Sequence, residues 1–565
     1  MGELISPQET FEFESKSKFD PFTSLHSVDH ASSNPAADST TCLWEGATSR
    51  NEQKWRPGAR DWVILFCVII LATMDAFNST LTITMLPRLA NEFDKPLIST
   101  IWVTTIYLVL GAIAQLFFTM LSDVFNQGLV WLAAALLSAV GTGICSGSST
   151  LTVVIVGRML QGIGGGGALA LCFVVVQETT PQSIHSRYSC WIQLAQLFGF
   201  MLGPIIGGLI ADNMDWRTVF YLNYIFCCPC LMVIPVAFPF SEVIDRPRHE
   251  SLRNMRKPDW SGATMASVGL TGILVGVGCI GTSYGWDNWQ IWAPIALGIL
   301  AIIVLISYEA KWACCPQFGA EAFRDLPTIM TYVGCFCHGF VFICQLQIFT
   351  LYFMCTRYFP AIVSGVALFG ITGFAATPAA VVGILLARDS YCSKWIISGG
   401  WMLTTAIAGC SILLNSITPT VGWVMLLLTA GLGHGLLFSS YNIRIQNMPT
   451  NDKAAFSTQP TSISIFARTW GMAFAIPIGV LVFLTCFGNQ LQIIGLSLDL
   501  TITSRGYLAL MNQVIVSENE REAIKHGSVF ALQVIWEVIA GVAAFGGISS
   551  IFLWRSRESY DQRRR

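Results

Sequence analysis

GFMLGPIIGG, residues 199–208, is the stretch that decides the fold of this chain. Three of its glycines recur at every fourth position, so they share one face of a helix, and a fourth lies beside them. Glycines at this spacing let two membrane helices approach to backbone distance, and the proline among them removes a backbone donor and favours a bend. The spacing alone also fits ordinary small-residue packing, but the full string is more specific. The residues expected to serve helix packing and gating are Gly199, Gly203, Pro204, Gly207 and Gly208.

The composition of the whole chain indicates a membrane protein. Of its 565 residues, 53% are hydrophobic and only 12% are charged, whereas soluble proteins carry about 25% charged residues. Several soluble domains would need a charged surface that this chain does not have, and a disordered chain would be poorer in apolar residues. The net charge of −2 gives no basic surplus for a nucleic acid partner. The composition therefore favours a polytopic protein in a lipid bilayer.

Long apolar runs divide the chain into membrane spans. A spanning helix needs about 20 mostly apolar residues, and continuous runs favour helices over barrel strands, which alternate over about ten residues. Fourteen spans are predicted, at 62–87, 100–120, 128–148, 151–177, 188–211, 217–239, 260–281, 291–309, 328–355, 361–386, 394–415, 420–442, 457–486 and 528–554. The expected fold class is therefore an all-α polytopic membrane protein.

The distribution of lysine and arginine predicts how the chain is oriented. Of the 32 basic residues, 23 fall in segments on the side of the N-terminus and seven on the other side. The remaining two, Arg158 and Arg468, fall within spans. Because cytoplasmic loops carry the excess of Lys and Arg in membrane proteins, both termini are expected in the cytoplasm, which also requires an even number of spans.

Two patterns resemble metal or cofactor motifs but are interpreted as helix packing. Cys227 and Cys230 form a CxxC in the middle of a span, where cysteine behaves as a small polarizable hydrophobe, and a zinc site would need four converging ligands. Residues 162–167 satisfy G-x-G-x-x-G, yet a dinucleotide site also needs a preceding strand and a soluble helix. No metal and no cofactor are expected. Without a Walker motif, ATP hydrolysis is not expected to drive the protein.

Several motifs, in order along 62–555, resemble those of one transporter family. The stretch 199–208 resembles the fifth-helix signature of proton-coupled exporters of the major facilitator superfamily. GRMLQGIGGGGA resembles the fourth-helix motif and carries it onto Arg158 and Gln161, and DWRTVFYLN and DWSGATMASVGL resemble the starts of the sixth and seventh helices. SIFARTWGMAFA resembles a thirteenth-helix pattern centred on Arg468. The chain is similar to the fungal members of the fourteen-span drug–proton antiporter branch, which export toxins and secondary metabolites.

The resemblance implies a domain organisation of two six-helix bundles. The polar N-terminal residues are typical of a disordered tail, and a basic segment follows the sixth span. The expected parts are a cytoplasmic disordered tail (1–60), an N-terminal bundle (61–240), a basic cytoplasmic linker (241–259), two extra transmembrane helices (260–310), a C-terminal bundle (311–555) with an outer loop (487–527), and a basic cytoplasmic tail (556–565).

Two departures from the family pattern bear on gating and coupling. The family's loop between helices two and three usually reads G-x-L-x-D-R-x-G-R-R/K, but TMLSDVFNQG keeps Asp123 without the basic residues. The resemblance implies that a latch on the cytoplasmic side is weak without these cations. Asn78 stands where the antiporter pattern usually has an acid, whereas Asp75, about one turn earlier, remains as an intramembrane acid.

Ionisable side chains near or within the spans are the candidates for proton coupling. Such a group costs about 2.5–3.5 kcal/mol at the membrane centre, so it indicates function. The coupling candidates are Asp75, Arg158 and Asp123. Asp75 can be neutral in lipid-like surroundings and ionised in a wet cavity, or it can serve as a helix-packing hydrogen bond. Arg468 is assigned to gating or helix packing.

Polar side chains within the spans are candidates for a central cavity. Mixed with aromatic residues, they suit a largely apolar ligand with a few hydrogen-bonding groups, although each alone also fits an interhelical hydrogen bond. The cavity candidates are Asn78, Gln161, Gln193, Gln345, His338 and His434.

The sequence thus predicts a secondary transporter and not an enzyme. The resemblance implies export of small amphiphilic organic molecules, such as a toxin, drug or fungal secondary metabolite, in exchange for protons. Uptake or uniport by the same fold is an alternative, favoured by Asn78 and the altered loop after Asp123. A polytopic membrane enzyme or receptor is a remote alternative. An enzyme should show a cluster of His, Asp or Cys near a membrane surface, and the sequence shows none. We expect a monomer in the plasma membrane.

Overall fold

The computed structural model describes most of the chain beyond its N-terminal tail. The described residues are 57–181, 184–238, 258–280, 287–313, 318, 323, 325–386, 393–446, 459–493 and 518–553. Arg56–Arg565 belong to one compact unit. The predicted tail 556–565 and nearly all of the tail 1–60 and the linker 241–259 lie outside the described residues.

Every regular element in the described part of the chain is a helix, which confirms the predicted fold class. The first half contains α1 (Ala59–Thr80), α2 (Leu86–Glu92), α3 (Leu97–Thr100), α4 (Trp102–Val124), α5 (Gln127–Ser146), α6 (Leu151–Thr179), α7 (His185–Asn213), α8 (Thr218–Tyr221) and α9 (Asn223–Ala237). The second half contains α12 (Trp260–Cys279), α13 (Trp289–Lys311), α14 (Leu326–Leu351), the π-helix η2 (Tyr352–Thr356), α15 (Ala361–Ala367), α16 (Phe369–Leu386), α17 (Ser393–Ser411), α18 (Thr420–Gln446), α19 (Gln459–Ile493) and α21 (Glu518–Ile551).

Thirteen helical segments of the described chain are long and apolar enough to cross a membrane. They lie at thirteen of the fourteen predicted spans. The remaining prediction, 394–415, falls on α17, a helix of 19 residues that is not among those thirteen. The number fourteen therefore stays a prediction, whereas the polytopic helical architecture is confirmed.

The first helix ends earlier than its predicted span, 62–87. Helix α1 stops at Thr80, and short turns follow, in which Ile83 N–H donates to the Thr80 carbonyl over 3.1 Å. Arg158 Nη2 donates to the Asn78 carbonyl over 2.7 Å, so a side chain from α6 satisfies one of the last carbonyls of α1. A contact between distant helices thus helps to end α1 inside an apolar run.

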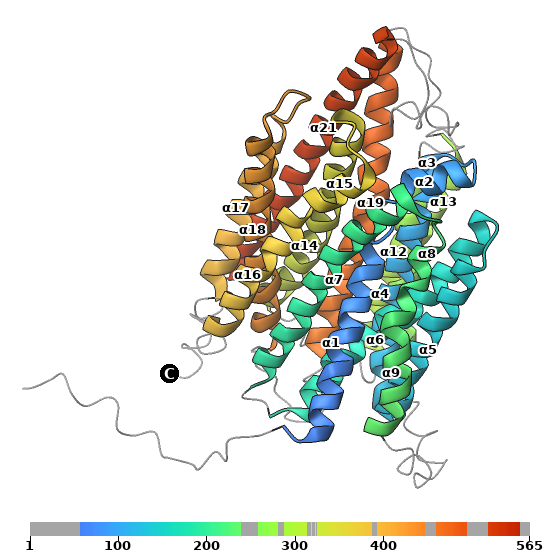
Figure 1. Ribbon diagram of the computed structural model, residues 1–565. Helices are drawn as coiled ribbons and strands as arrows, with labels where there is room; N and C mark the ends of the chain where they lie inside the picture. Colours follow the sequence, from blue (N-terminus) through green and yellow to red (C-terminus); the bar gives the residue numbers. More distant parts are fainter. Residues whose placement is uncertain are drawn as a thin grey trace, which may run out of the picture. The chain divides into compact units, whose positions relative to one another are not determined.

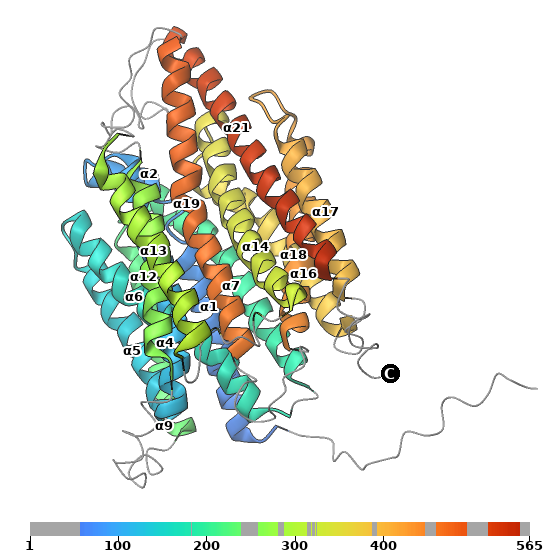
Figure 2. The same cartoon turned by 180° about the vertical axis from the view of Figure 1, so that it is seen from behind.

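The predicted outer loop, 487–527, is shorter than expected. Helix α19 continues to Ile493, and α21 begins at Glu518, so both helices extend into it. The two helices pack against each other and lie side by side in both views (Figures 1 and 2). Phe487 of α19 contacts the backbone of α21 at Gly527. Helix pairing therefore continues beyond the apolar stretches that defined the predicted spans.

Helix α7 lies where the first and second halves of the chain meet. It packs against α1 on one side and against α15, α16 and α18 on the other (Figure 1). A second contact between the halves joins α4 to α19. Helices α12 and α13 pack mainly on each other, and α12 also contacts α4 and α19 (Figure 2). The two halves thus meet along α7 and along the α4–α19 contact.

The glycines of 199–208 bring α7 to backbone distance from α1. A Cβ atom at Gly199 would collide with the Thr73 carbonyl and would lie 2.9 Å from the Phe77 nitrogen. Gly203 is equally close to the last turn of α1, and Gly207 is equally close to the Leu81 carbonyl just beyond the end of that helix. The predicted role in helix packing is thus visible as direct backbone contact.

The same helix also meets the second half of the chain. A Cβ atom at Gly208 would collide with the Ala361 carbonyl of α15, and one at Gly365 would collide with the Pro204 carbonyl. The Asp212 carboxylate accepts hydrogen bonds from the backbone N–H groups of Ala361, at 3.3 Å, and Ile362, at 2.8 Å. The C-terminal end of α7 therefore joins the first half of the chain to α15 in the second half.

We expect Gly199→Ala to destabilise the protein. Its methyl group has no space against the α1 backbone, and overpacking of this kind costs about 1–3 kcal/mol. Gly409→Ala is the matched control, because no heavy atom lies within 4 Å of a Cβ atom there. Thermal unfolding of the purified full chain should show a lower Tm for the first variant alone. Equal melting of both variants would contradict the close contact.

Candidate functional site

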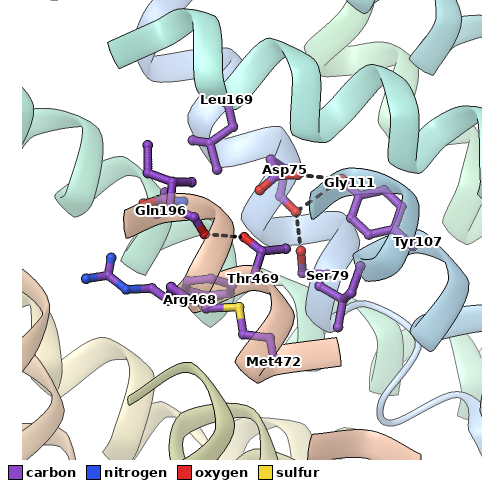
Figure 3. Close-up of a pocket in the computed structure, with 12 residues that line it drawn as sticks. Asp75, Ser79, Tyr107, Gly111, Leu169, Gln196, Arg468, Thr469 and Met472 are labelled. Atoms are coloured by element: carbon purple, nitrogen blue, oxygen red, sulfur yellow. Dashed lines mark hydrogen bonds between the residues drawn. The ribbon is translucent and has the colours of Figure 1, made fainter. Parts of the chain in front are cut away.

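A small cavity lies among α1, α4, α6, α7 and α19, where the two halves of the chain meet (Figure 3). The space inside it measures about 20 Å³, which is room for about one water molecule. The polar residues that line it are Asp75, Ser79, Tyr107, Gln196, Arg468 and Thr469. Because a carboxyl group and a guanidinium group share this small space, the cavity is the candidate functional site.

Asp75 lies on the α1 wall of the cavity and is 8% exposed. The Tyr107 hydroxyl donates to Asp75 Oδ1 over 2.9 Å (Figure 3). Gly165 of α6 makes this pair possible, because a Cβ atom there would collide with the Tyr107 hydroxyl and lie 3.1 Å from Asp75 Oδ1. Among the described residues, no Lys, Arg or His nitrogen lies within 4.0 Å of this carboxylate. Asp75 is thus a buried acid that contacts the cavity.

Arg158 lies behind Tyr107 and is completely buried. Its three nitrogen atoms donate to the Val103 carbonyl at 3.0 Å, Gln161 Oε1 at 3.0 Å and the Asn78 carbonyl at 2.7 Å. Its guanidinium carbon lies 4.3 Å from the centre of the Tyr107 ring. Arg158 therefore joins α1, α4 and α6 and contacts Asp75 only through Tyr107.

Asn78 and Gln161 belong to a polar network inside the first half of the chain. The Asn78 amide donates to Asn223 Oδ1 over 2.6 Å, and Gln161 Nε2 donates to Thr142 Oγ1 over 2.9 Å. Asn223 in turn donates to Thr142, which closes the network. Neither Asn78 nor Gln161 is among the residues that line the cavity. Their side chains are instead held by neighbouring helices.

Arg468 lies on the α19 wall and is 7% exposed. Its Nη1 donates to Gln193 Oε1 over 3.3 Å. The guanidinium carbon lies 4.4 Å from the centre of the Phe438 ring. Its Nε atom is buried and has no hydrogen-bond partner among the described residues. The sequence assigned Arg468 to gating or packing, whereas the structure places it at the cavity.

The remaining cavity candidates form a cluster in the second half of the chain. His434 contacts His338 over 3.3 Å and Gln345 Oε1 over 2.7 Å through its two ring nitrogens. All three side chains are fully buried, and none lines the cavity. The Phe438 ring packs against His338, with centroids 5.2 Å apart, and against Arg468. Phe438 thus contacts both this cluster and Arg468.

The cavity is closed toward both ends of the bundle. Toward the end where α1 and α19 begin, Gln115 donates to Thr469 Oγ1 over 2.9 Å and Gln177 donates to Thr461 Oγ1 over 3.0 Å. Toward the other end, α7 contacts α15 through Gly208 and the Asp212 carboxylate. With about 20 Å³ of space, the cavity can hold a molecule larger than water only if the helices around it move apart.

Asp123 lies apart from the cavity, at the end of α4. Its side chain is exposed, and no basic nitrogen of the described residues lies within 4.0 Å of its carboxylate. The loop motif that would supply basic residues is altered in this chain. The structure thus contains no ion pair between Asp123 and a described basic side chain.

The two motifs interpreted as helix packing lie inside helices. Residues 162–167 are in the middle of α6, and a Cβ atom at Gly166 would collide with the backbone of Gly111 in α4. Cys227 and Cys230 are buried in α9 with free thiols. Among the described residues, no three His, Cys, Asp or Glu side chains come together as metal ligands.

Sequence reasoning did not single out Tyr107, Ser79 or Thr469 as site residues. Tyr107 lies in the apolar run IYLVLGAIAQL, where a phenol hydroxyl needs a polar partner. A phenol hydroxyl within an apolar run could have indicated that Tyr107 has a polar partner, but not that the partner is Asp75. Ser79 and Thr469 carry no comparable signal, because Ser and Thr hydroxyls often bond to the carbonyl four residues earlier, as both do here.

The sequence is similar to one family of transporters and to fungal members of it. Residues 68–476 match the model of the Major Facilitator Superfamily. The MFS transporter L2 of Phoma sp. is 28% identical over 89% of this chain and 84% of its own length. The MFS efflux transporter aclA of Aspergillus oryzae is 26% identical over 86% of this chain and 88% of its own. The efflux pump FUS6 of Gibberella fujikuroi is 25% identical over 74% of this chain and 75% of its own.

Two solved structures share the fold at low sequence identity. The human organic anion transporter MFSD10 is 13% identical, with a TM-score of 0.53 over 87% of this chain and all of its own. A bacterial homologue of the human lysosomal transporter Spinster, in an inward-facing conformation, is 12% identical, with a TM-score of 0.54 over 89% of this chain and 99% of its own. At these identities the likeness concerns the fold alone.

Proposed function

This chain belongs to the major facilitator superfamily, and on that premise we propose that it exports small amphiphilic organic molecules in exchange for protons. The predicted family, the multi-pass membrane fold and the assignment as a transporter rather than an enzyme are thereby confirmed. Export is supported by the fungal relatives, two of which are named as efflux transporters and share most of their length with this chain. Toxins or secondary metabolites are the cargo class that follows from the sequence.

The buried acid at the cavity supports proton coupling. Asp75 lines the space between the two halves of the chain and receives a hydrogen bond from Tyr107. A carboxyl group in this position can take up a proton from one side and release it to the other when the cavity opens alternately. This single observation carries the antiport part of the proposal.

Alternating access needs two closures that open in turn. The α4–α19 contacts close the end that we assign to the cytoplasm, and the α7–α15 contact closes the outer end. Rocking of the N-terminal bundle (61–240) against the C-terminal bundle (311–555) would break one set of contacts and keep the other. Asp123 forms no ion pair with a described basic side chain, which supports an inner closure weaker than the family's complete loop motif would give.

The cellular setting follows from the same proposal. Export of a small molecule requires a multi-pass protein in the bilayer, and we place it as a monomer in the plasma membrane with both termini in the cytoplasm. The excess of Lys and Arg on the side of the N-terminus supports this orientation.

Uptake or uniport is the second candidate function. It is favoured by Asn78, which stands where the antiporter pattern usually has an acid and whose amide is engaged with Asn223. Without an acid there, the chain has one fewer group that could carry a proton.

Inverted membrane vesicles that contain the full chain separate these functions. We expect a fluorescent amphiphilic probe, tested as a panel of charged and neutral pyrene derivatives, to accumulate inside when the lumen is acidic. The lumen then corresponds to the cell exterior, so accumulation means export against proton entry. Vesicles without the protein are the control. Probe entry that ignores the imposed pH gradient would remove the antiport proposal and leave uniport.

A further inference from the structure

Among the residues that the structure describes, the charge on Arg468 has no anionic partner within 4.0 Å. Its guanidinium contacts the Gln193 amide oxygen and the Phe438 ring, both of which are neutral. Its Nε atom makes no hydrogen bond with any described residue, although the side chain is 93% buried. The ion pair that the described residues do form, Arg217–Asp215, is elsewhere. Arg468 thus lines the cavity, and no described carboxylate lies within 4.0 Å of its guanidinium.

Arg158, the other arginine buried in the described part of the bundle, differs from Arg468 in its hydrogen bonding. Each nitrogen of Arg158 donates to an oxygen. Arg468, from the second half, instead has a buried Nε atom for which no described residue provides an acceptor.

An unbalanced buried cation is expensive, because the low dielectric of the interior penalises a charge without a partner. A guanidinium also offers several N–H groups in a planar arrangement that fits a carboxylate or another oxyanion. A cation kept at the cavity under these conditions is best explained by a negative group that arrives with the ligand.

The surroundings of Arg468 are apolar and aromatic. Phe200 lines the cavity with Met472, and its ring packs against Phe342 and Phe438 at centroid distances of 5.1 Å and 6.1 Å. These side chains suit the body of a hydrophobic or aromatic molecule, whereas Arg468 suits a charged end. The cavity wall thus combines the two properties of an amphiphilic anion.

We propose that the cargo is an amphiphilic organic anion, whose carboxylate or comparable oxyanion pairs with Arg468 while its apolar body lies against Phe200 and Met472. This inference rests on the proposed transport function. It also supplies an additional driving force, because an anion that leaves the cell moves down the inside-negative membrane potential.

Binding of matched probes to the purified full chain tests this inference. The probes are a panel of aromatic carboxylates that includes pyrenebutyrate, each paired with its neutral methyl ester. We expect at least one carboxylate to bind about tenfold to a hundredfold more tightly than its ester, the range expected for hydrogen bonds to a charged group. If no carboxylate binds more tightly than its ester, the inference is overturned.

Three variants assign any preference to the proposed residue. Arg468→Gln should bring the affinity for the carboxylate down to that for the ester and leave ester binding unchanged, which also shows that the variant is folded. Arg468→Lys should keep part of the preference. Arg444→Gln is the control, because Arg444 is a half-buried arginine of the same half that bonds to Thr331 and does not line the cavity. A preference that survives in Arg468→Gln would refute the assignment.

Transport by the wild-type chain separates this inference from the proposed function. In inverted vesicles, a lumen-positive potassium diffusion potential at equal pH should drive uptake of the preferred carboxylate. Uptake that responds to this potential but not to a pH gradient would remove proton antiport and leave the anion site intact. Accumulation of neutral esters in response to the pH gradient, without any preference for the carboxylate, would support proton antiport and remove the anion site.

Discussion

Asp75→Asn is expected to abolish accumulation of cargo against its gradient while leaving exchange of cargo across the membrane intact. Asparagine has nearly the same shape as aspartate, and its Oδ1 atom can still accept the hydrogen bond that Tyr107 donates over 2.9 Å. The amide cannot take up and release a proton. The variant should therefore fold and change conformation, but it should no longer couple these changes to protons.

The size of the effect follows from the energy in a proton gradient. A difference of about one pH unit is worth about 1.4 kcal/mol, which supports roughly tenfold accumulation for each proton exchanged. In inverted vesicles with an acidic lumen, the wild-type chain should approach this ratio. The Asp75→Asn variant should stop at a ratio of about one, while radiolabelled probe inside the vesicles should still exchange with unlabelled probe outside.

Asp61→Asn is the matched control for this experiment. Asp61 lies on the same helix, but its carboxylate accepts a hydrogen bond from the Gly58 backbone at the start of α1, far along the chain from the cavity. It should accumulate probe as the wild type does. An Asp75→Asn variant that still concentrates probe in response to the pH gradient would show that another group carries the proton.

The arrangement of helices could be predicted from the sequence because it depends on local properties. Apolar runs of sufficient length define spans without knowledge of their neighbours, and thirteen of the predicted positions hold such helices. The close approach of α7 to α1 was also predictable, since glycines at every fourth position permit it wherever they face another helix. Gly199 and Gly203 indeed meet the α1 backbone.

The ends of elements were less predictable, because distant residues determine them. Helix α1 ends at Thr80 although the apolar run continues, and the Asn78 carbonyl that this leaves is satisfied by Arg158, 80 positions later in the chain. No local pattern in the first span contains this information.

The residue types at the site were partly predictable, but their grouping was not. Asp75 and Arg468 could be found because ionisable groups are rare in spans. Their approach to one cavity depends on how α1 and α19 meet, which the sequence alone does not reveal. For the same reason, Asn78 and Gln161 looked equivalent to cavity residues, although Asn223 and Thr142 hold them within the first half of the chain.

Arg158→Lys is expected to destabilise the protein strongly, even though it keeps the positive charge. The guanidinium of Arg158 reaches three acceptors on three helices, the Val103 carbonyl, Gln161 Oε1 and the Asn78 carbonyl. An ammonium group is a compact charge and cannot reproduce this planar, spread arrangement in a site with no exposed surface. Some of the acceptors would be left buried and unpaired, and the network that ends α1 would be broken.

The cost should approach that of breaking a buried charged network, about 3–5 kcal/mol. Thermal unfolding of the purified full chain should show this as a large drop in Tm. Arg60→Lys is the control, because Arg60 is exposed and makes a single hydrogen bond, from Nε to the Ala237 carbonyl over 2.8 Å. It should shift the stability by no more than about 0.5 kcal/mol. If Arg158→Lys melted at the same temperature as the wild type, the three hydrogen bonds of Arg158 would not be what holds these helices together. The positive charge beside Tyr107, which lysine keeps, would then be sufficient for stability.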